Sequence, residues 1–220
     1  LPRQQTLRAL IDWSYQTLND TEQRALRRLA VFSGGWTFEA AEAVIGESEA
    51  FDGLAGLVNK SLVSVDDQEG ASRYRFLETI RQYAMDKLVE TGEATETRNR
   101  PLDFMLEFAG GNRSSRYDLS LDWLYRLDGE YDNLRAALEW AALNDIEKAI
   151  HLTLRLGWYW STRDNISEAL FWYRTILQKS EALPDHNSER AEIYSLLGWI
   201  SILVGQHREG LAAAENAISL

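Results

Sequence analysis

The stretch LVNKSLVSVDDQEGASRYRFLETIRQYAMDKLVE, residues 57–90, decides the fold because its hydrophobic period changes twice. Leu62–Val65 has the two-residue period of a strand, and Arg73–Phe76 has the composition of the returning strand. The polar segment 66–72 between them contains a glycine and predicts a turn. Leu77–Glu90 then resumes the helical period. We therefore expect a hairpin followed by a closing helix.

Shorter helices are expected before the hairpin. Apolar residues recur at helical spacing over residues 7–18, 20–32, 38–45 and 51–59. Asn19 with Glu22 three residues later has the capping-box pattern, and Thr37 is placed to cap the third helix. Three or four helices, a hairpin and a closing helix predict a winged helix. We assign residues 1–96 to it.

The remaining residues, 97–220, have helical periodicity and no strand pattern. Pro101 and Pro184 are expected to mark boundaries, because proline disrupts a helix interior. Leu156-Gly157-Trp158 recurs as Leu197-Gly198-Trp199, a spacing typical of an α-solenoid of tetratricopeptide type. The predicted fold class is therefore mainly all-α, with a winged helix and its small β-hairpin before a tetratricopeptide-like solenoid. The chain begins at Leu1 and stops inside the second repeat, so we expect a piece of a longer protein.

Composition argues against several functions. The chain has 23 Lys and Arg against 34 Asp and Glu, a formal net charge of −11, and it has no cysteine. It has no phosphate-binding glycine loop, no nucleophile elbow, no metal-ligand spacing among its three histidines, and no apolar run of membrane-spanning length. We expect no catalytic residues, cofactor, metal site or membrane contact in this chain, and a cytoplasmic location.

A winged helix raises the question of DNA. The segment expected to enter the major groove, residues 52–60, offers Lys60 and no arginine. Residues 1–96 carry 10 Lys and Arg against 16 Asp and Glu, a net charge of −6. Neutralising phosphates requires several cations, so we expect this module not to read DNA. DNA binding by the winged helix and a free tetratricopeptide adaptor remain the alternatives.

Five ordered blocks resemble one family. They are RALIDWSY (residues 8–15), LAVFSGGWT (29–37), LVNKSLV (57–63), RYRFLETIRQYA (73–84) and EYDNLRAAL (130–138). Together they are similar to bacterial multidomain regulators of the STAND class of signal-transduction ATPases. The resemblance implies a winged helix and repeats that follow an ATPase core, which would lie outside this chain and bind ADP or ATP. It implies a non-catalytic regulatory and interaction arm, with that core as partner of the winged helix and a peptide, protein or small-molecule effector on the repeats.

The resemblance also singles out the start of the closing helix. Related plant-resistance and apoptosome-type ATPases place a Met-His-Asp motif there, whose histidine touches the ADP phosphate. The similar stretch here is Phe76-Leu77-Glu78, and leucine cannot donate a hydrogen bond, so a direct phosphate contact is in doubt. Leu77, Glu78 and Arg81 are the candidate contacts to the core. The alternative is that neither charge has a functional contact: the helix dipole stabilises the Glu78 carboxylate in the first turn, and Arg81 is an exposed helix residue.

In the repeats, helical register predicts the inner face. Trp158 and Trp199 occupy matching positions, where they could anchor a ligand or pack in the core. Asp132-Asn133 is expected to cap a helix that begins near Leu134. The inner-face residues of the two repeats are His151, Leu154, Trp158 and Thr162, then Glu192, Ser195, Trp199 and Ile202.

Overall fold

The computed structural model of the chain divides into two compact units, each described here by itself. The structure describes residues 2–68, 71–111 and 121–220. Unit 1 comprises Leu1–Phe104 with Glu130–Ala136, and unit 2 comprises Met105–Gly129 with Ala137–Leu220. The chain first passes from unit 1 to unit 2 after Phe104, whereas the sequence places the division after residue 96. Helix α6 continues through that position, and a segment of α7 packs with unit 1.

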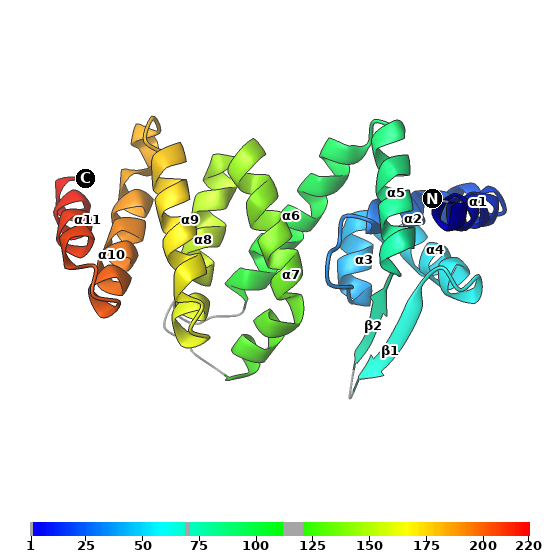
Figure 1. The fold of residues 1–220 in the computed structure, drawn as a ribbon, viewed down its shortest axis with the longest axis horizontal. Coiled ribbons are helices and arrows are strands. Elements are labelled where there is room, and N and C mark those ends of the chain that lie inside the picture. Colours follow the sequence, from blue (N-terminus) through cyan, green and yellow to red (C-terminus); the bar gives the residue numbers. More distant parts are fainter. Residues whose placement is uncertain (1, 69–70, 112–120) are drawn as a thin grey trace. The chain divides into compact units, whose positions relative to one another are not determined.

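Unit 1 contains the winged helix (Figure 1). Its β1 and β2 pair antiparallel, with Ser64 opposite Arg75 and Val65 opposite Tyr74. Trp36 adds a single bridge to Tyr74 through two backbone hydrogen bonds of 2.8 Å, so the hairpin gains a minimal third strand. The elements are α1 (Pro2–Gln16), α2 (Asp20–Leu29), α3 (Phe38–Ile45), α4 (Glu47–Asn59), β1 (Ser64–Gln68), β2 (Ala71–Arg75) and α5 (Glu78–Glu90).

Local signals in the sequence explain where these helices begin. Asn19 accepts a hydrogen bond from the backbone N–H of Glu22, and the Glu22 carboxylate accepts one from that of Asn19, which confirms the capping box. Thr37 caps α3 through the N–H of Ala40, as expected. Strand β1 begins two residues later than expected. The N–H of Leu62 instead donates to Leu57 at the end of α4, and its side chain joins the core.

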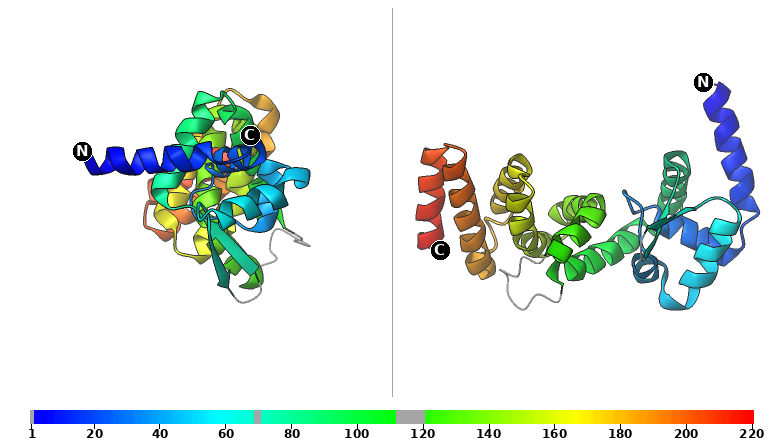
Figure 2. Two further views of the ribbon diagram at one scale, coloured as in Figure 1. Left: turned by 90° about the vertical axis from the view of Figure 1, so that its right-hand side faces the viewer. Right: turned by 90° about the horizontal axis from the view of Figure 1, so that it is seen from below.

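Aromatic and aliphatic side chains fill the core of unit 1. Trp36 is 1 % exposed and packs between Phe32 and Phe76, with ring centroids 5.7 and 4.8 Å away. Leu29 and Leu57 are also fully buried. Helix α1 lies against α5 and otherwise extends away from the rest of unit 1 (Figure 2).

Pro101 does not end a helix, although the chain passes from unit 1 to unit 2 close to it, after Phe104. Helix α6 (Ala94–Gly110) runs through it. Proline lacks the N–H that would bond the carbonyl four residues earlier, which costs helix stability. Pro101 and Leu102 are both buried, and this packing offsets the missing hydrogen bond. Pro184, by contrast, begins the short 3-10 turn between two helices, as expected.

Unit 2 is a helical solenoid. Short connections at residues 163–165 and 204–206 make hairpins of α8 with α9 and of α10 with α11 (Figure 1). A Cβ at Gly210 would lie 2.6 Å from Ile202 Cγ1, and Ala169 occupies the matching position of the first hairpin, fully buried. Small residues at both positions let the paired helices approach closely. The elements are α7 (Leu121–Asn144), α8 (Ile146–Thr162), α9 (Ile166–Lys179), η1 (Pro184–His186), α10 (Asn187–Leu203) and α11 (His207–Ser219).

The fold class is therefore confirmed as a mainly helical chain with a winged helix followed by a helical solenoid. Among the helices that the structure describes, none combines the length and the apolar character needed to cross a bilayer.

Candidate functional site

The three residues singled out at the start of the closing helix lie on the surface of unit 1. Leu77 is the N-cap of α5, and its side chain is 66 % exposed. Arg81 donates two hydrogen bonds of 2.8 Å to the Glu78 carboxylate, which lower the pKa of Glu78 and raise the pKa of Arg81. These two charges neutralise each other within one turn. The exposed side chain of Leu77 adds an apolar surface beside the Glu78–Arg81 ion pair.

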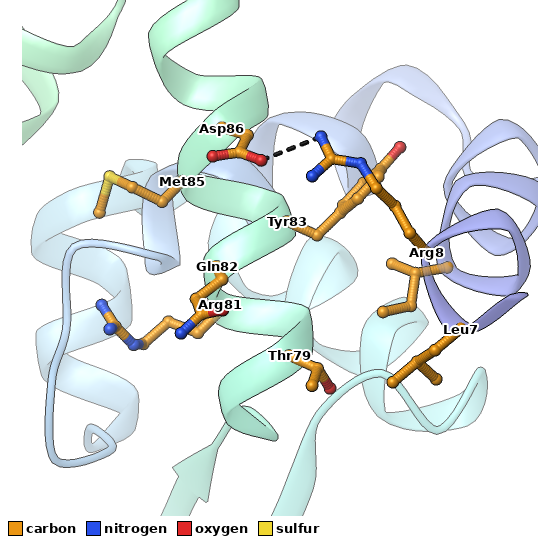
Figure 3. A pocket seen from close by; sticks show the side chains of 9 residues that line it. Leu7, Arg8, Thr79, Arg81, Gln82, Tyr83, Met85 and Asp86 are labelled. Carbon is orange, nitrogen blue, oxygen red and sulfur yellow. Dashed lines mark ion pairs between the residues drawn. The ribbon is translucent and has the colours of Figure 1, made fainter. Parts of the chain in front are cut away.

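A hollow of about 480 Å³ lies between α1 and α5, and Arg81 is one of its lining residues (Figure 3). Arg8 and Asp86 form an ion pair of 3.0 Å at its edge. Tyr83 donates a hydrogen bond of 2.6 Å to Asp12, and burial together with this carboxylate raises the pKa of the phenol. The hollow therefore offers polar and apolar surface, with its charges paired.

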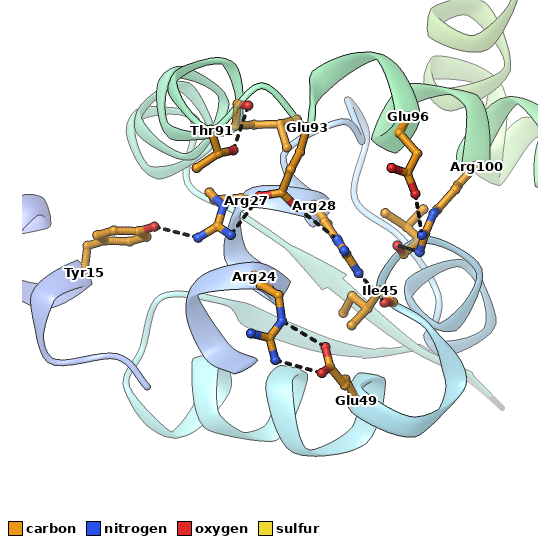
Figure 4. A network of polar contacts seen from close by, with 12 residues as sticks. Tyr15, Arg24, Arg27, Arg28, Ile45, Glu49, Thr91, Glu93, Glu96 and Arg100 are labelled. Carbon is orange, nitrogen blue, oxygen red and sulfur yellow. Dashed lines mark hydrogen bonds and ion pairs between the residues drawn. The ribbon is translucent and has the colours of Figure 1, made fainter. Parts of the chain in front are cut away.

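A second polar cluster joins α2 to the residues between α5 and α6 (Figure 4). Arg27 donates to Glu93 at 2.9 and 3.2 Å and to the Tyr15 hydroxyl at 2.9 Å. Arg28 donates to the carbonyl of Ile45 at 2.8 Å. Burial alone would raise the pKa of Glu93, but hydrogen bonds from Arg27 and Thr91 and the charges of Arg27 and Arg28 outweigh it and lower the pKa. Arg27 and Arg28 of α2 therefore connect it to α1, to α3 and to the residues before α6.

The segment Glu130–Ala136 of α7 attaches to the winged helix through a group of hydrogen bonds that we name the Asn133 latch. Asn133 is 4 % exposed, and its Nδ2 donates to the Gly35 carbonyl at 2.7 Å and to Glu130 Oε2 at 2.6 Å. Its Oδ1 accepts from the N–H groups of Ser33 at 2.9 Å and Gly34 at 3.3 Å. All polar atoms of the amide therefore have partners.

Arg73 of the hairpin completes the Asn133 latch. It donates to Glu130 Oε1 at 2.6 Å and to the Gly34 carbonyl at 3.2 Å. Gly35 has a φ of +81°, and a Cβ there would lie 2.6 Å from the Tyr74 carbonyl oxygen, so the position requires glycine. The blocks that contain Ser33–Gly35, Arg73 and Glu130–Asn133 are thus joined in space.

The expectation that Asp132-Asn133 caps a helix is wrong. Helix α7 runs from Leu121 to Asn144, so both residues lie in its interior. An asparagine followed by an apolar helical stretch resembles an N-cap in sequence. Here the Asn133 amide instead bonds to backbone groups about 100 positions earlier in the chain.

In unit 2, Trp158 and Trp199 come together on facing helices. Their ring centroids lie 6.1 Å apart, Trp158 is half-buried and Trp199 is 46 % exposed. They line a cavity of about 720 Å³ between α8 and α10, which we name the tryptophan groove. Its lining residues are Trp158, Ser161, Ser188, Ala191, Glu192, Ser195, Leu196 and Trp199.

Six of the predicted inner-face residues are candidate ligand contacts: His151, Trp158, Thr162, Glu192, Ser195 and Trp199. Four of them line this groove, and His151 and Thr162 do not. The Thr162 hydroxyl donates to the Trp158 carbonyl of its own helix at 2.8 Å. His151 lies two turns before Trp158 and packs edge-on against His186, with ring centroids 6.4 Å apart. Ser161 and Ser188 were not singled out in the sequence, although Ser188 lies one turn before Glu192 on the same helix.

Comparison with known proteins adds a family match for part of the chain. Residues 18–89 match the winged helix-turn-helix domain. A protein of Mycobacterium tuberculosis (strain H37Rv) named "Putative HTH-type transcriptional regulator Rv0890c" is 41 % identical over 182 residues, which are 80 % of this chain and 20 % of that protein. The same values hold for "Putative HTH-type transcriptional regulator Mb0914c" of Mycobacterium bovis.

A further M. tuberculosis relative, "Uncharacterized protein Rv0894", is 43 % identical over 97 residues, which are 41 % of this chain and 25 % of that protein. This chain spans about a fifth of the length of the first relatives. No solved structure matches it significantly. Residues 18–89 therefore form a winged helix-turn-helix domain, in a chain that is similar to proteins named as transcriptional regulators.

Proposed function

We propose that this chain is a non-catalytic regulatory and interaction module of a larger transcriptional regulator, and that its winged helix contacts protein rather than DNA. The observation that carries the proposal is the surface of α4. This is the second helix of the helix-turn-helix, the one that enters the major groove in DNA-binding relatives of the fold.

The exposed side chains of α4 do not suit a DNA groove. Glu47, Ser48 and Asp52 are exposed, and Phe51 is 70 % exposed. The helix contains no lysine or arginine, and Lys60, just beyond its end, forms an ion pair with Glu22. Phosphate groups would meet carboxylates here, which raises the free energy of association. Aromatic side chains are enriched in protein–protein interfaces, so the exposed Phe51 suits a protein contact better than a charged DNA groove.

The cations around α4 and the hairpin also have partners within unit 1. Arg24 pairs with Glu49 at 2.7 Å, and Arg73 pairs with Glu130 in the Asn133 latch. Binding a phosphate with either arginine would leave a carboxylate without its cation. The gain from releasing counterions from DNA would therefore be partly lost.

The resemblance to STAND regulators suggests a specific partner for the winged helix. The exposed Leu77, with the Glu78–Arg81 pair beside it, is proposed to contact a nucleotide-binding core whose ADP and ATP states favour different contacts with this arm. Mixing the chain with such a core in ADP and then in ATP tests this. A difference in affinity between the two states supports it, and equal affinity contradicts it.

The tryptophan groove is proposed to hold a peptide or small-molecule effector. Two indole rings provide a large apolar contact area, and Glu192 adds a carboxylate, a combination that favours an apolar or cationic group. Screening a peptide array with the chain tests this. Trp199→Ala is expected to lose the selected peptides, whereas Trp13→Ala, which removes an exposed tryptophan of unit 1, is expected to retain them. Equal retention by both variants would contradict the proposal.

The winged helix-turn-helix match favours a second function, which is direct DNA binding through α4. Selection from a pool of random duplexes at low salt distinguishes the two. The proposal predicts no enriched sequence. An enriched motif that is lost in Phe51→Ala, but retained in Phe171→Ala on the exposed surface of unit 2, would replace the proposal with this second function.

A further inference from the structure

We propose that His151, His186 and Glu189 form a site for a divalent transition-metal ion, for which Zn²⁺ is the appropriate probe. The three residues come from α8, from η1 and from the first turn of α10, all within unit 2. One potential ligand atom from each residue lies within 4.8 Å of the other two.

His186 is held in an orientation that suits a metal ligand. Its Nδ1 is buried, makes no hydrogen bond to any residue that the structure describes, and lies 3.9 Å from Glu189 Oε2. Its Nε2, on the opposite side of the ring, lies 3.5 Å from Glu147 Oε1. A carboxylate this close to Nε2 favours the tautomer that carries its proton on Nε2 and leaves Nδ1 free to bind a metal. Metal-binding histidines commonly have such a partner, which also orients the ring.

His151 supplies the second imidazole from the neighbouring helix. It lies one turn after Glu147 on α8, and its side chain is exposed, so it can rotate toward an ion. Ligand atoms around a tetrahedral zinc ion lie about 2.0–2.2 Å from the metal and hence roughly 3.3–3.5 Å from one another. The ligand atoms of the three residues therefore need to approach one another by about an ångström, which side-chain rotation can supply.

The donor set distinguishes between metal ions. Two imidazoles and one carboxylate are the ligands that Zn²⁺ prefers, and three protein ligands leave a fourth position for water or a ligand group. Mg²⁺ and Ca²⁺ require six or more oxygen ligands and are not expected to bind here. The site could not be predicted from the sequence, because His151 and His186 are far apart in the chain and come together through helix packing.

A bound ion would link α8 to η1 and the start of α10. These are the helices that form the tryptophan groove, and Ser188, which lines the groove, is next to Glu189. The ion would therefore fix the spacing of the two helices at one end of the groove.

Titration of the tag-free 220-residue chain with Zn²⁺, followed by calorimetry, tests the site. We expect one ion per chain, and Co²⁺ bound at the same site should show the visible absorption of a four-coordinate ion. His151→Ala and His186→Ala are each expected to weaken binding at least tenfold. Glu147→Gln is expected to weaken it by about 10- to 100-fold, as loss of a partner to a ligand does.

His207→Ala provides the matched control, because it removes the third histidine of the chain, which lies at the start of α11. Its affinity should equal that of the wild type, and Mg²⁺ should not compete. Circular dichroism establishes that each variant is folded, and Glu147→Gln retains both histidines if an alanine variant unfolds. Absence of saturable Zn²⁺ binding would overturn the proposal, and so would equal affinity of the His207→Ala and His186→Ala variants.

Discussion

The Asn133 latch is predicted to stabilise unit 1 by an amount that can be estimated from its hydrogen bonds. Asn133→Ala removes four hydrogen bonds, of which three go to the backbone of residues 33–35 and one goes to Glu130. Each is worth about 0.5–1.5 kcal/mol net. The better helix propensity of alanine returns roughly 0.5 kcal/mol. Four such bonds less the propensity gain give an expected fall in the free energy of unfolding of unit 1 of about 1.5–5.5 kcal/mol.

Two further variants separate the latch from a general effect of substitution on α7. Asn144→Ala removes an exposed amide that, among the described residues, donates to the Trp140 carbonyl of its own helix, and it should change stability by less than about 0.5 kcal/mol. Asn133→Asp keeps an acceptor for Ser33 but places a carboxylate against Glu130 and the Gly35 carbonyl. At neutral pH it should be more harmful than alanine, because like charges repel where solvent is excluded.

Urea unfolding measures the loss of free energy, and hydrogen exchange of the backbone amides of residues 33–36 measures it locally. The latch predicts faster exchange of these amides in Asn133→Ala than in Asn144→Ala. If the two variants unfold at the same urea concentration and exchange at the same rate, the latch does not stabilise unit 1, and this reasoning fails.

Two other predictions concern unit 1. Gly35→Ala should destabilise unit 1 by about 1–3 kcal/mol or more in urea unfolding, because the residue has a positive φ and the added Cβ would meet the Tyr74 carbonyl. The control is Gly129→Ala, which should be neutral or stabilising because the added Cβ meets no described atom within 4 Å. The pKa of Glu93 is lowered from its ordinary 4.5, so its contribution to stability is complete above that pH and is lost as the pH falls below it. Arg27→Met should flatten this part of the stability–pH curve measured by thermal unfolding, and an unchanged curve would contradict the role of the pair.

Much of unit 1 could be predicted from the sequence because its signals are local. The capping box of Asn19 with Glu22 and the cap at Thr37 each involve residues three positions apart, and the structure contains both. The change of hydrophobic period likewise predicted the hairpin. The end of α4 was also predicted correctly, but the start of β1 was not, because Leu62 bonds back to Leu57 instead of starting the strand.

What could not be predicted depends on contacts distant in sequence. Asn133 has the sequence environment of a helix cap, and only the approach of residues 33–35 shows its function. His151 and His186 show no metal-ligand spacing, yet the packing of α8 against α10 brings them together. The repeat register, by contrast, correctly paired Trp158 with Trp199, because a helical repeat carries equivalent positions to equivalent places.

The most direct test of the central claim is to titrate the isotope-labelled chain with duplex DNA at low salt and to follow the backbone amide resonances of α4. A winged helix that contacts protein through Phe51 and its acidic neighbours predicts no saturable shifts in residues 47–59. Saturable, sequence-dependent shifts confined to α4 would contradict the claim and identify it as a groove-reading helix.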